Sequence, residues 1–205
     1  MKAKTDTTYL IEGQPKLATL DSPVRQEILD AIHALGACTV AEIAELLNRA
    51  PDSLYYHLKI LLNVELVRET GVRQSGLRPE TLFDIPGRPM RIKYSADPDV
   101  REAIGRIVSG LLRLTDRDFR AVVRQRETLR GDGATVLTGG RTKAWLAPEQ
   151  ISSINNLLQE IETIMASGRK APDTHLMAFA RVLIPLAESR RIRTPQRASK
   201  TQKDS

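Results

Sequence analysis

The sequence is poor in the features that mark secreted and membrane proteins. Its 205 residues include one cysteine, Cys38, so an internal disulfide framework is excluded and a reducing compartment fits. No apolar run approaches the ~20 residues of a membrane-spanning helix. The opening stretch MKAKTDTT lacks the apolar core of a signal peptide. The sequence therefore predicts a cytoplasmic protein with no membrane partner.

The chain also lacks the groups on which enzymes depend. Its three histidines are scattered, and neither a P-loop nor a GxGxxG motif is present to cradle a phosphate. Cys38 stands alone, and His33 and His57 do not complete a ligand set, because a thiolate site needs more than one sulfur. We predict no catalysis, no cofactor and no metal site. A metal or redox switch built on Cys38 is an alternative.

Positive charge is unevenly distributed along the chain. The total of +6 divides into −3 over residues 1–48, +3 over 49–93, +1 over 94–188 and +5 over 189–205. The last of these segments has almost no apolar residues, so we expect a disordered basic tail. The positive charge of residues 49–93 is more informative about partners, because this segment is predicted to fold into a helix and a hairpin.

Three short helices are predicted close to the N-terminus. The first begins after Ser22, has Pro23 in its first turn and ends at Gly36. The second opens with the capping-box sequence TVAE, residues 39–42. The third, PDSLYYHLKILLN, opens at Pro51. Two short helices joined by a tight turn predict a helix-turn-helix unit.

The third helix has one apolar and one polar face. Its buried stripe is predicted to consist of Leu54, Leu58, Leu61 and Leu62. The polar face suits a DNA major groove, with side chains near the N-terminal end at base edges and two cations near phosphates. The residues with base-contact roles are Asp52, Ser53, Tyr55 and Tyr56, and those with phosphate-contact roles are Arg49 and Lys59. An ordinary solvated helix face is the alternative.

A β-hairpin is predicted directly after the third helix. ELVRET and ETLFDI have the composition of short strands, and GVRQSGLRP between them supplies two glycines and two arginines. Such a hairpin is a wing, from whose tip Arg73 and Arg78 would reach phosphates or the minor groove. Loop arginines that only increase solubility are the alternative.

Residues 17–85 resemble the DNA-binding domain of the arsenic-repressor (ArsR) type of winged-helix regulator. The segments that carry the resemblance are LDSPVRQEIL, TVAEIAELLN, SLYYHLKILLNVELV and ETLFDI. The resemblance implies a homodimer that reads a partly palindromic operator, usually as a repressor relieved by a signal. Two departures concern Asp52, where a neutral residue is usual, and the sequence Asn63-Val64-Glu65, which replaces a common glycine-containing turn.

The C-terminal half is predicted to begin with a long helix that ends before Gly131. Asp97-Pro98 caps it, and an apolar stripe runs from Val100 to Leu129. A stripe of that length favours pairing with a second subunit. The opposite face carries arginines that suit an anionic ligand or DNA, or only a solvated ion-paired surface, at positions Arg106, Arg113, Arg117, Arg120 and Arg124.

The remaining elements predict a small α+β module. ATVLT and RTKAWL flank Gly139-Gly140 as a hairpin, and PEQISSINNLLQEIETIMAS reads as a helix. HLMAFARVLIPL, residues 175–186, fits a buried strand better than a short helix. Trp145 is expected in the module's core, with a place in a ligand pocket as the alternative. The longer ArsR-type regulators, which this arrangement resembles, carry such a module for dimerisation or sensing.

Together these observations predict a mainly α fold with small β elements. The expected organisation is a flexible segment 1–8, a winged helix-turn-helix domain 9–96, a linking helix 97–131, the α+β module 132–188 and the tail 189–205. The predicted function is a homodimeric repressor that binds duplex DNA and responds to an unidentified effector, for which a small molecule is a candidate. A winged-helix interaction module without specific DNA binding is the main alternative, motivated by Asp52 and the acidic first 48 residues.

Overall fold

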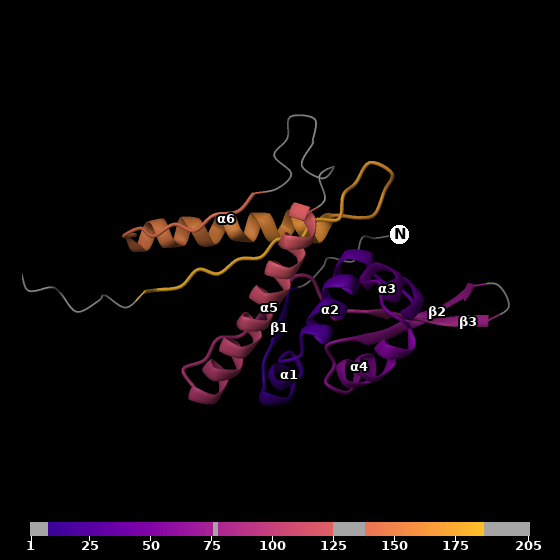
Figure 1. Cartoon of the computed structure of the whole chain (residues 1–205). Coiled ribbons are helices and arrows are strands. Elements are labelled where there is room, and N and C mark those ends of the chain that lie inside the picture. The colour runs from indigo at the N-terminus through magenta and orange to yellow at the C-terminus, as the bar shows by residue number, and fades with distance from the viewer. Residues whose placement is uncertain (1–7, 76–77, 125–137, 187–205) are drawn as a thin grey trace, which may run out of the picture.

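The computed structural model describes residues 8–75, 78–124 and 138–186. Nearly all of the predicted segment 1–8, the end of the long helix and the basic tail lie outside the described residues. The elements are β1 Tyr9–Ile11, α1 Gln14–Thr19, α2 Pro23–Leu35, α3 Val40–Leu47, α4 Asp52–Asn63, β2 Arg68–Ser75, β3 Arg78–Asp84, β4 Met90–Ile92, α5 Pro98–Arg124 and α6 Pro148–Ser167. The predicted fold class, mainly helical with small sheets, is confirmed (Figure 1).

The core lies where α2, α3 and α4 meet. Ile28 and Ile32 of α2, Ile43 of α3 and Leu54 of α4 are completely buried, and Leu58 is 2% exposed. Leu54 and Leu58 belong to the apolar stripe that the sequence predicts, and Ile28 and Ile32 recur at the four-residue spacing of one helical face. Burial of each such side chain contributes about 1.5–3 kcal/mol. The three helices therefore form a packed unit that holds the outer face of α4 in a fixed orientation.

Local signals set the ends of these helices. The capping box of α3 forms as predicted: Glu42 N–H donates to the Thr39 hydroxyl at 3.2 Å, and Thr39 N–H donates to the Glu42 carboxylate at 2.8 Å. Gly36 ends α2 with a φ of 77°, a value that L side chains rarely adopt. Asn48 ends α3 in the left-handed conformation, which directs the chain into the turn before α4.

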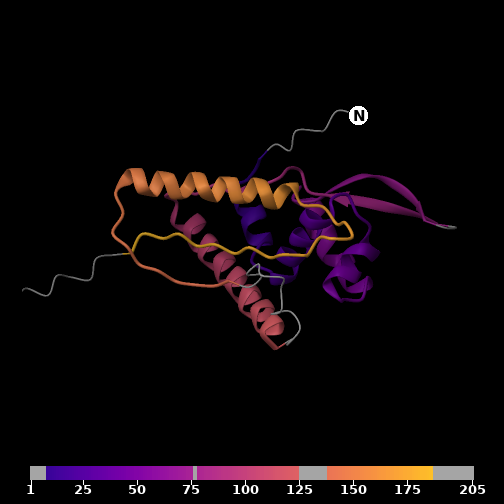
Figure 2. The ribbon, with the colours of Figure 1, turned by 90° about the horizontal axis from the view of Figure 1, so that it is seen from above.

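The wing is longer than the sequence predicts. β2 and β3 pair antiparallel from Arg68↔Asp84 to Ser75↔Arg78, with a register shift between Glu69 and Gly71. The hairpin extends away from the helical body in both views (Figures 1 and 2). Composition alone marks residues 71–75 as a loop because they include glycine and polar residues, yet pairing with β3 continues through them.

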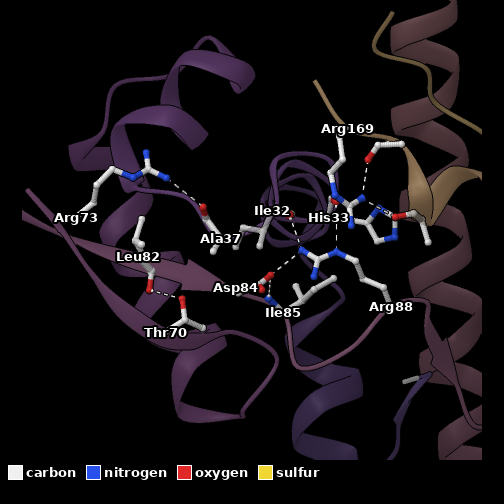
Figure 3. A network of polar contacts seen from close by, with 12 residues as sticks. Ile32, His33, Ala37, Thr70, Arg73, Leu82, Asp84, Ile85, Arg88 and Arg169 are labelled. Atoms are coloured by element: carbon white, nitrogen blue, oxygen red, sulfur yellow. Dashed lines mark hydrogen bonds and ion pairs between the residues drawn. The ribbon is translucent and has the colours of Figure 1, made fainter. Parts of the chain in front are cut away.

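Polar contacts hold the base of the wing against α2 and the loop that follows it. Cys38 and Phe83 form an antiparallel bridge. Cys38 N–H donates to the Phe83 carbonyl and Phe83 N–H to the Cys38 carbonyl, with nitrogen-to-oxygen distances of 2.9 and 2.7 Å. Arg88 is buried and donates to the Ile32 carbonyl at 3.0 Å and to the Asp84 carboxylate at 2.6 Å (Figure 3). A cation is favourable at the carboxyl end of a helix, because the helix dipole places partial negative charge there.

A small two-stranded sheet at the edge of the domain was not predicted. β1 pairs parallel with β4, from Tyr9↔Met90 to Ile11↔Ile92. Three-residue strands are too short to show an alternating pattern, and a parallel pair joins segments about eighty residues apart. Helix α1, which follows β1, buries Leu17 in the hydrophobic core.

The apolar contacts of helix α5 with the domain lie in its first half. Ala103, Ile104 and Ile107 are buried, while Leu112 and Phe119 farther along are about half exposed. The Asp97 carboxylate accepts from Asp99 N–H at 2.9 Å, as expected of the predicted cap. The predicted helix is observed up to Arg124, where the described part of α5 ends.

The structure corrects the predicted strands of the C-terminal module. RTKAWL, residues 141–146, and residues 175–186 form neither strand nor helix, while ATVLT lies largely outside the described residues. Trp145 is 86% exposed, so it is not the core residue predicted. An apolar run becomes a strand only where another strand supplies its hydrogen bonds, and no described segment pairs with either of these two.

Candidate nucleic-acid interface

The outer face of α4 carries every polar side chain that the sequence predicts there. Burial of Leu54, Leu58 and Leu61 fixes the rotation of the helix about its axis. The opposite side chains are exposed, namely Asp52, Ser53, Tyr55, Tyr56, Lys59 and Asn63. A rigid helix of 12 residues that presents hydroxyls, a carboxylate, an amide and an ammonium group fits the width of a DNA major groove.

The two tyrosines dominate this surface. Tyr55 is 56% exposed and Tyr56 is 69% exposed. The Tyr56 ring meets His57 edge-on at 5.4 Å, which restricts its orientation. Neither hydroxyl is engaged by a described residue, so both phenol groups are available to donate and accept hydrogen bonds. Large aromatic groups that remain in water next to a polar surface are typical of recognition sites.

The first turn of α4 combines a hydroxyl and a carboxylate. The Ser53 hydroxyl donates to the Ala50 carbonyl at 2.6 Å, which leaves its lone pairs for an incoming donor. Asp52 lies in the same turn, where a negative charge interacts favourably with the helix dipole. The unusual carboxylate therefore has a structural benefit that is independent of any DNA contact.

Arg49 lies in the turn before α4, but its charge is already paired. Its guanidinium donates to the Glu27 carboxylate at 2.8 Å, and that carboxylate side chain is only 9% exposed. An arginine bound to a buried carboxylate has less net charge to offer a phosphate. The sequence places Arg49 correctly and gives no sign of this partner, which is 22 residues away.

Arg73 does not lie at the tip of the wing as predicted. It lies within β2, opposite Glu80, and its side chain turns back toward α3. The guanidinium donates to the Glu42 carboxylate at 2.7 Å. It also donates to the Ala37 carbonyl at 3.4 Å (Figure 3). Burial acts to raise the pKa of Glu42, but the Thr39 N–H and the Arg73 guanidinium outweigh it and hold this pKa below its usual value.

Lys59 and Arg78 are the two predicted cations that form no ion pair with any described residue. Lys59 is on the exposed face of α4, and Arg78 is the first residue of β3 at the outer end of the wing. Of the four cations predicted to contact DNA, Arg49 and Arg73 are therefore ion-paired within the protein. Lys59 and Arg78 are not paired with any described residue. Nothing in the linear sequence distinguishes these two groups.

Two titratable side chains of the domain are tuned by burial. Burial, followed by the charges of Arg25 and Arg49, lowers the pKa of His57, so this imidazole is neutral near pH 7. Burial also raises the pKa of the Cys38 thiol to about 12. Because the thiolate is the metal-binding and reactive form of cysteine, this raised pKa and the 1% exposure of Cys38 disfavour a switch there.

The described part of the chain lacks two kinds of feature that would indicate other partners. No helix among residues 8–75, 78–124 and 138–186 is long and apolar enough to cross a membrane. Within the same ranges, no three histidine, cysteine or acidic side chains gather where they could hold a metal ion.

Comparison with known proteins identifies the central part of the domain. Residues 20–70 match a family model described as a helix-turn-helix domain, which spans α2, α3, α4 and the start of β2. No curated protein matches the chain. The chain therefore carries a helix-turn-helix domain with a hairpin wing, a type of domain typical of non-enzymatic, DNA-binding transcription regulators.

Proposed function

We propose that the chain is a sequence-specific transcription regulator that binds duplex DNA through α4 and the wing. The observation that carries the proposal is the exposed polar face of α4, with Tyr55 and Tyr56 in water, inside a matched helix-turn-helix domain. Surface helices are usually polar, but a solvated face has no need of two large aromatic side chains.

In the proposed complex, α4 enters the major groove with its N-terminal end toward the bases. Tyr55, Tyr56, Ser53 and Asp52 take the base-edge roles, and a carboxylate such as that of Asp52 accepts from cytosine N4. Lys59 contacts a phosphate beside the groove, and Arg78 contacts a phosphate or the adjacent minor groove from the end of the wing.

We further propose that the regulator acts as a homodimer and, following its ArsR-type resemblance, as a repressor released by a signal. The exposed apolar residues along the outer half of α5, Leu112, Phe119 and Val123, support pairing of this helix with a second copy. The apolar side chains of residues 176–186 are exposed as well, which supports a role for this segment in assembly or in binding a small-molecule effector.

A winged-helix interaction module without specific DNA binding is the second candidate. It is favoured by the pairing of Arg49 with Glu27 and of Arg73 with Glu42, which leaves fewer free cations on the DNA-facing side. This candidate predicts weak, sequence-independent DNA affinity that is due to the basic residues 189–205.

Selection from a random duplex pool, followed by fluorescence anisotropy across a salt series, distinguishes the two candidates. The full chain and a variant ending at Glu188 are each measured with the selected duplex and with a scrambled one. Preference for the selected duplex that survives truncation supports the proposed regulator. Equal affinity for both duplexes that disappears with the tail supports the interaction module instead.

A further inference from the structure

Glu27 of α2 joins two arginines that come from different parts of the chain. Its Oε2 atom accepts from Arg49 at 2.8 Å, and its Oε1 atom accepts from Arg117 of α5 at 2.6 Å. The Glu27 side chain is 9% exposed, whereas those of Arg49 and Arg117 are 35% and 53% exposed. One nearly buried carboxylate therefore links the turn of the helix-turn-helix unit to the long C-terminal helix.

The two arginines share a single negative charge. A buried carboxylate is costly unless it is paired, so Glu27 keeps at least one guanidinium beside it. When both are present, each one reduces the negative potential that attracts the other. Arg117 is also held by Asp118 at 2.6 Å on its own helix, and these two acidic partners raise its pKa. The Arg117 guanidinium therefore moves with α5 when that helix moves.

Arg49 is placed where this sharing affects DNA binding. It follows the left-handed Asn48 and lies three residues before Asp52, the first residue of the proposed recognition helix. A DNA phosphate near this turn competes with Glu27 for the same guanidinium. If Arg117 leaves Glu27, the carboxylate holds Arg49 more strongly, and less of its charge is available to the phosphate.

We propose that Glu27 is a positioning residue through which α5 controls how far Arg49 is available to the DNA backbone. The inference rests on the proposed DNA-binding function and adds a route for its regulation. Any partner or effector that moves α5 changes the contact between Arg117 and Glu27. The change reaches Arg49 directly through the shared carboxylate, without rearrangement of the helical core.

The test is a double-mutant cycle in the full chain, with affinity for a mixed-sequence duplex measured from about 50 to 200 mM salt. Arg117→Ala should weaken binding by about three- to ten-fold in the wild-type background, since coupled neighbours interact on this scale. In a Glu27→Gln background the same change should have much less effect, because no carboxylate remains to trap Arg49.

Matched controls exist for both substitutions. Arg120→Ala removes a cation that pairs within α5 to Asp116 at 2.9 Å and has no bond to α2. Glu45→Gln removes an exposed acidic charge of α3, close to the same turn. Glu27→Gln should increase the salt dependence of binding by about one unit more than Glu45→Gln does, because it releases Arg49.

Four outcomes have defined meanings. An Arg117→Ala loss that exceeds that of Arg120→Ala and largely disappears in Glu27→Gln supports the proposal. The same loss in both backgrounds means that Arg117 acts on DNA directly, and it overturns the proposal. If Glu27→Gln does not fold, the single variants still test the proposal. Equal losses of duplex affinity in Arg117→Ala and Arg120→Ala would overturn it. Absence of duplex binding by the wild-type chain overturns the proposed function as well, which separates the two failures.

Discussion

Arg73 of the wing forms an ion pair of 2.7 Å with Glu42, the residue that closes the N-terminal cap of α3. The wing is thereby tied to the first helix of the helix-turn-helix unit, and the orientation of the hairpin relative to α4 is restricted. Arg73 thus acts mainly within the protein, whereas Arg78 at the outer end of the hairpin has no such partner among the described residues.

The two wing arginines are therefore expected to differ in DNA binding. Arg78→Ala should lower the slope of log affinity against log salt by about one unit, because one phosphate contact is lost. Arg73→Ala should change this slope much less, because its charge is already neutralised by Glu42. Anisotropy titrations with one duplex across a salt series compare the two variants. Equal slopes for Arg73→Ala and Arg78→Ala would show that the ion pair opens on binding.

The cap of α3 should contribute measurably to stability. Thr39→Ala removes the acceptor for Glu42 N–H and is expected to cost about 1 kcal/mol of unfolding free energy. Urea denaturation of the full chain gives this value. Thr115→Ala is a suitable control, since that hydroxyl is exposed on α5 and bonds only to a carbonyl of its own helix. A loss no larger than that of the control would contradict the role of the cap.

Cys38 should be unreactive in the folded protein. The thiol is 1% exposed and burial raises its pKa to about 12, so both access and thiolate formation are suppressed near pH 7. A thiol-reactive chromophore should therefore label Cys38 slowly in native buffer and rapidly in denaturant. Rapid native labelling, or DNA affinity that responds to oxidant in the wild type but not in Cys38→Ala, would support the alternative of a redox switch.

Asp30 is expected to give stability a distinct pH dependence. Surrounding protein atoms, followed by the charges of Glu27 and Asp118, raise the pKa of Asp30 to about 6, although its side chain keeps contact with solvent. A carboxyl whose folded pKa is raised binds its proton more tightly when folded, so it reduces stability as pH rises from about 4 to about 6. Glu27, one of these acidic neighbours, is itself ion-paired with Arg49 and Arg117.

Asp30→Asn should consequently stabilise the protein at pH 7 and leave its stability near pH 4 almost unchanged. The gain is expected to be at most about 1 kcal/mol, because solvent screens the repulsion. Urea denaturation at both pH values measures the difference. A variant that is equally or less stable than the wild type at pH 7 would show that Asp30 has a favourable partner.

The parts of the fold that the sequence predicts well are those set by local rules. Helical spacing identifies the buried faces of α2 and α4, and the sequence TVAE identifies the start of α3. These features depend on neighbours within a few residues. The exposed face of α4 is a direct consequence of its buried face, so the proposed recognition residues are placed correctly on the helix surface.

The parts that could not be predicted depend on residues far apart in the sequence. β1 and β4 are short strands that pair across the whole domain, and the strands predicted at residues 141–146 and 175–186 do not form because no described strand pairs with them. Dependence on distant residues also explains why the pairing of the site's cations could not be predicted. The partners of Arg49 and Arg73 come from α2 and α3, so whether a cation is free or paired is decided by tertiary contacts.

The central claim is that the outer face of α4 reads DNA sequence, and Tyr56 tests it most directly. The measurement is the ratio of affinities for a selected and a scrambled duplex, compared between wild type, Tyr56→Ala and Tyr94→Ala. Tyr94 is 75% exposed and lies outside α4, so it controls for loss of an exposed aromatic group. We predict that Tyr56→Ala lowers the ratio by roughly 5- to 150-fold, which corresponds to ~1–3 kcal/mol for a lost base contact, while Tyr94→Ala leaves it unchanged. An unchanged ratio in Tyr56→Ala would contradict the account.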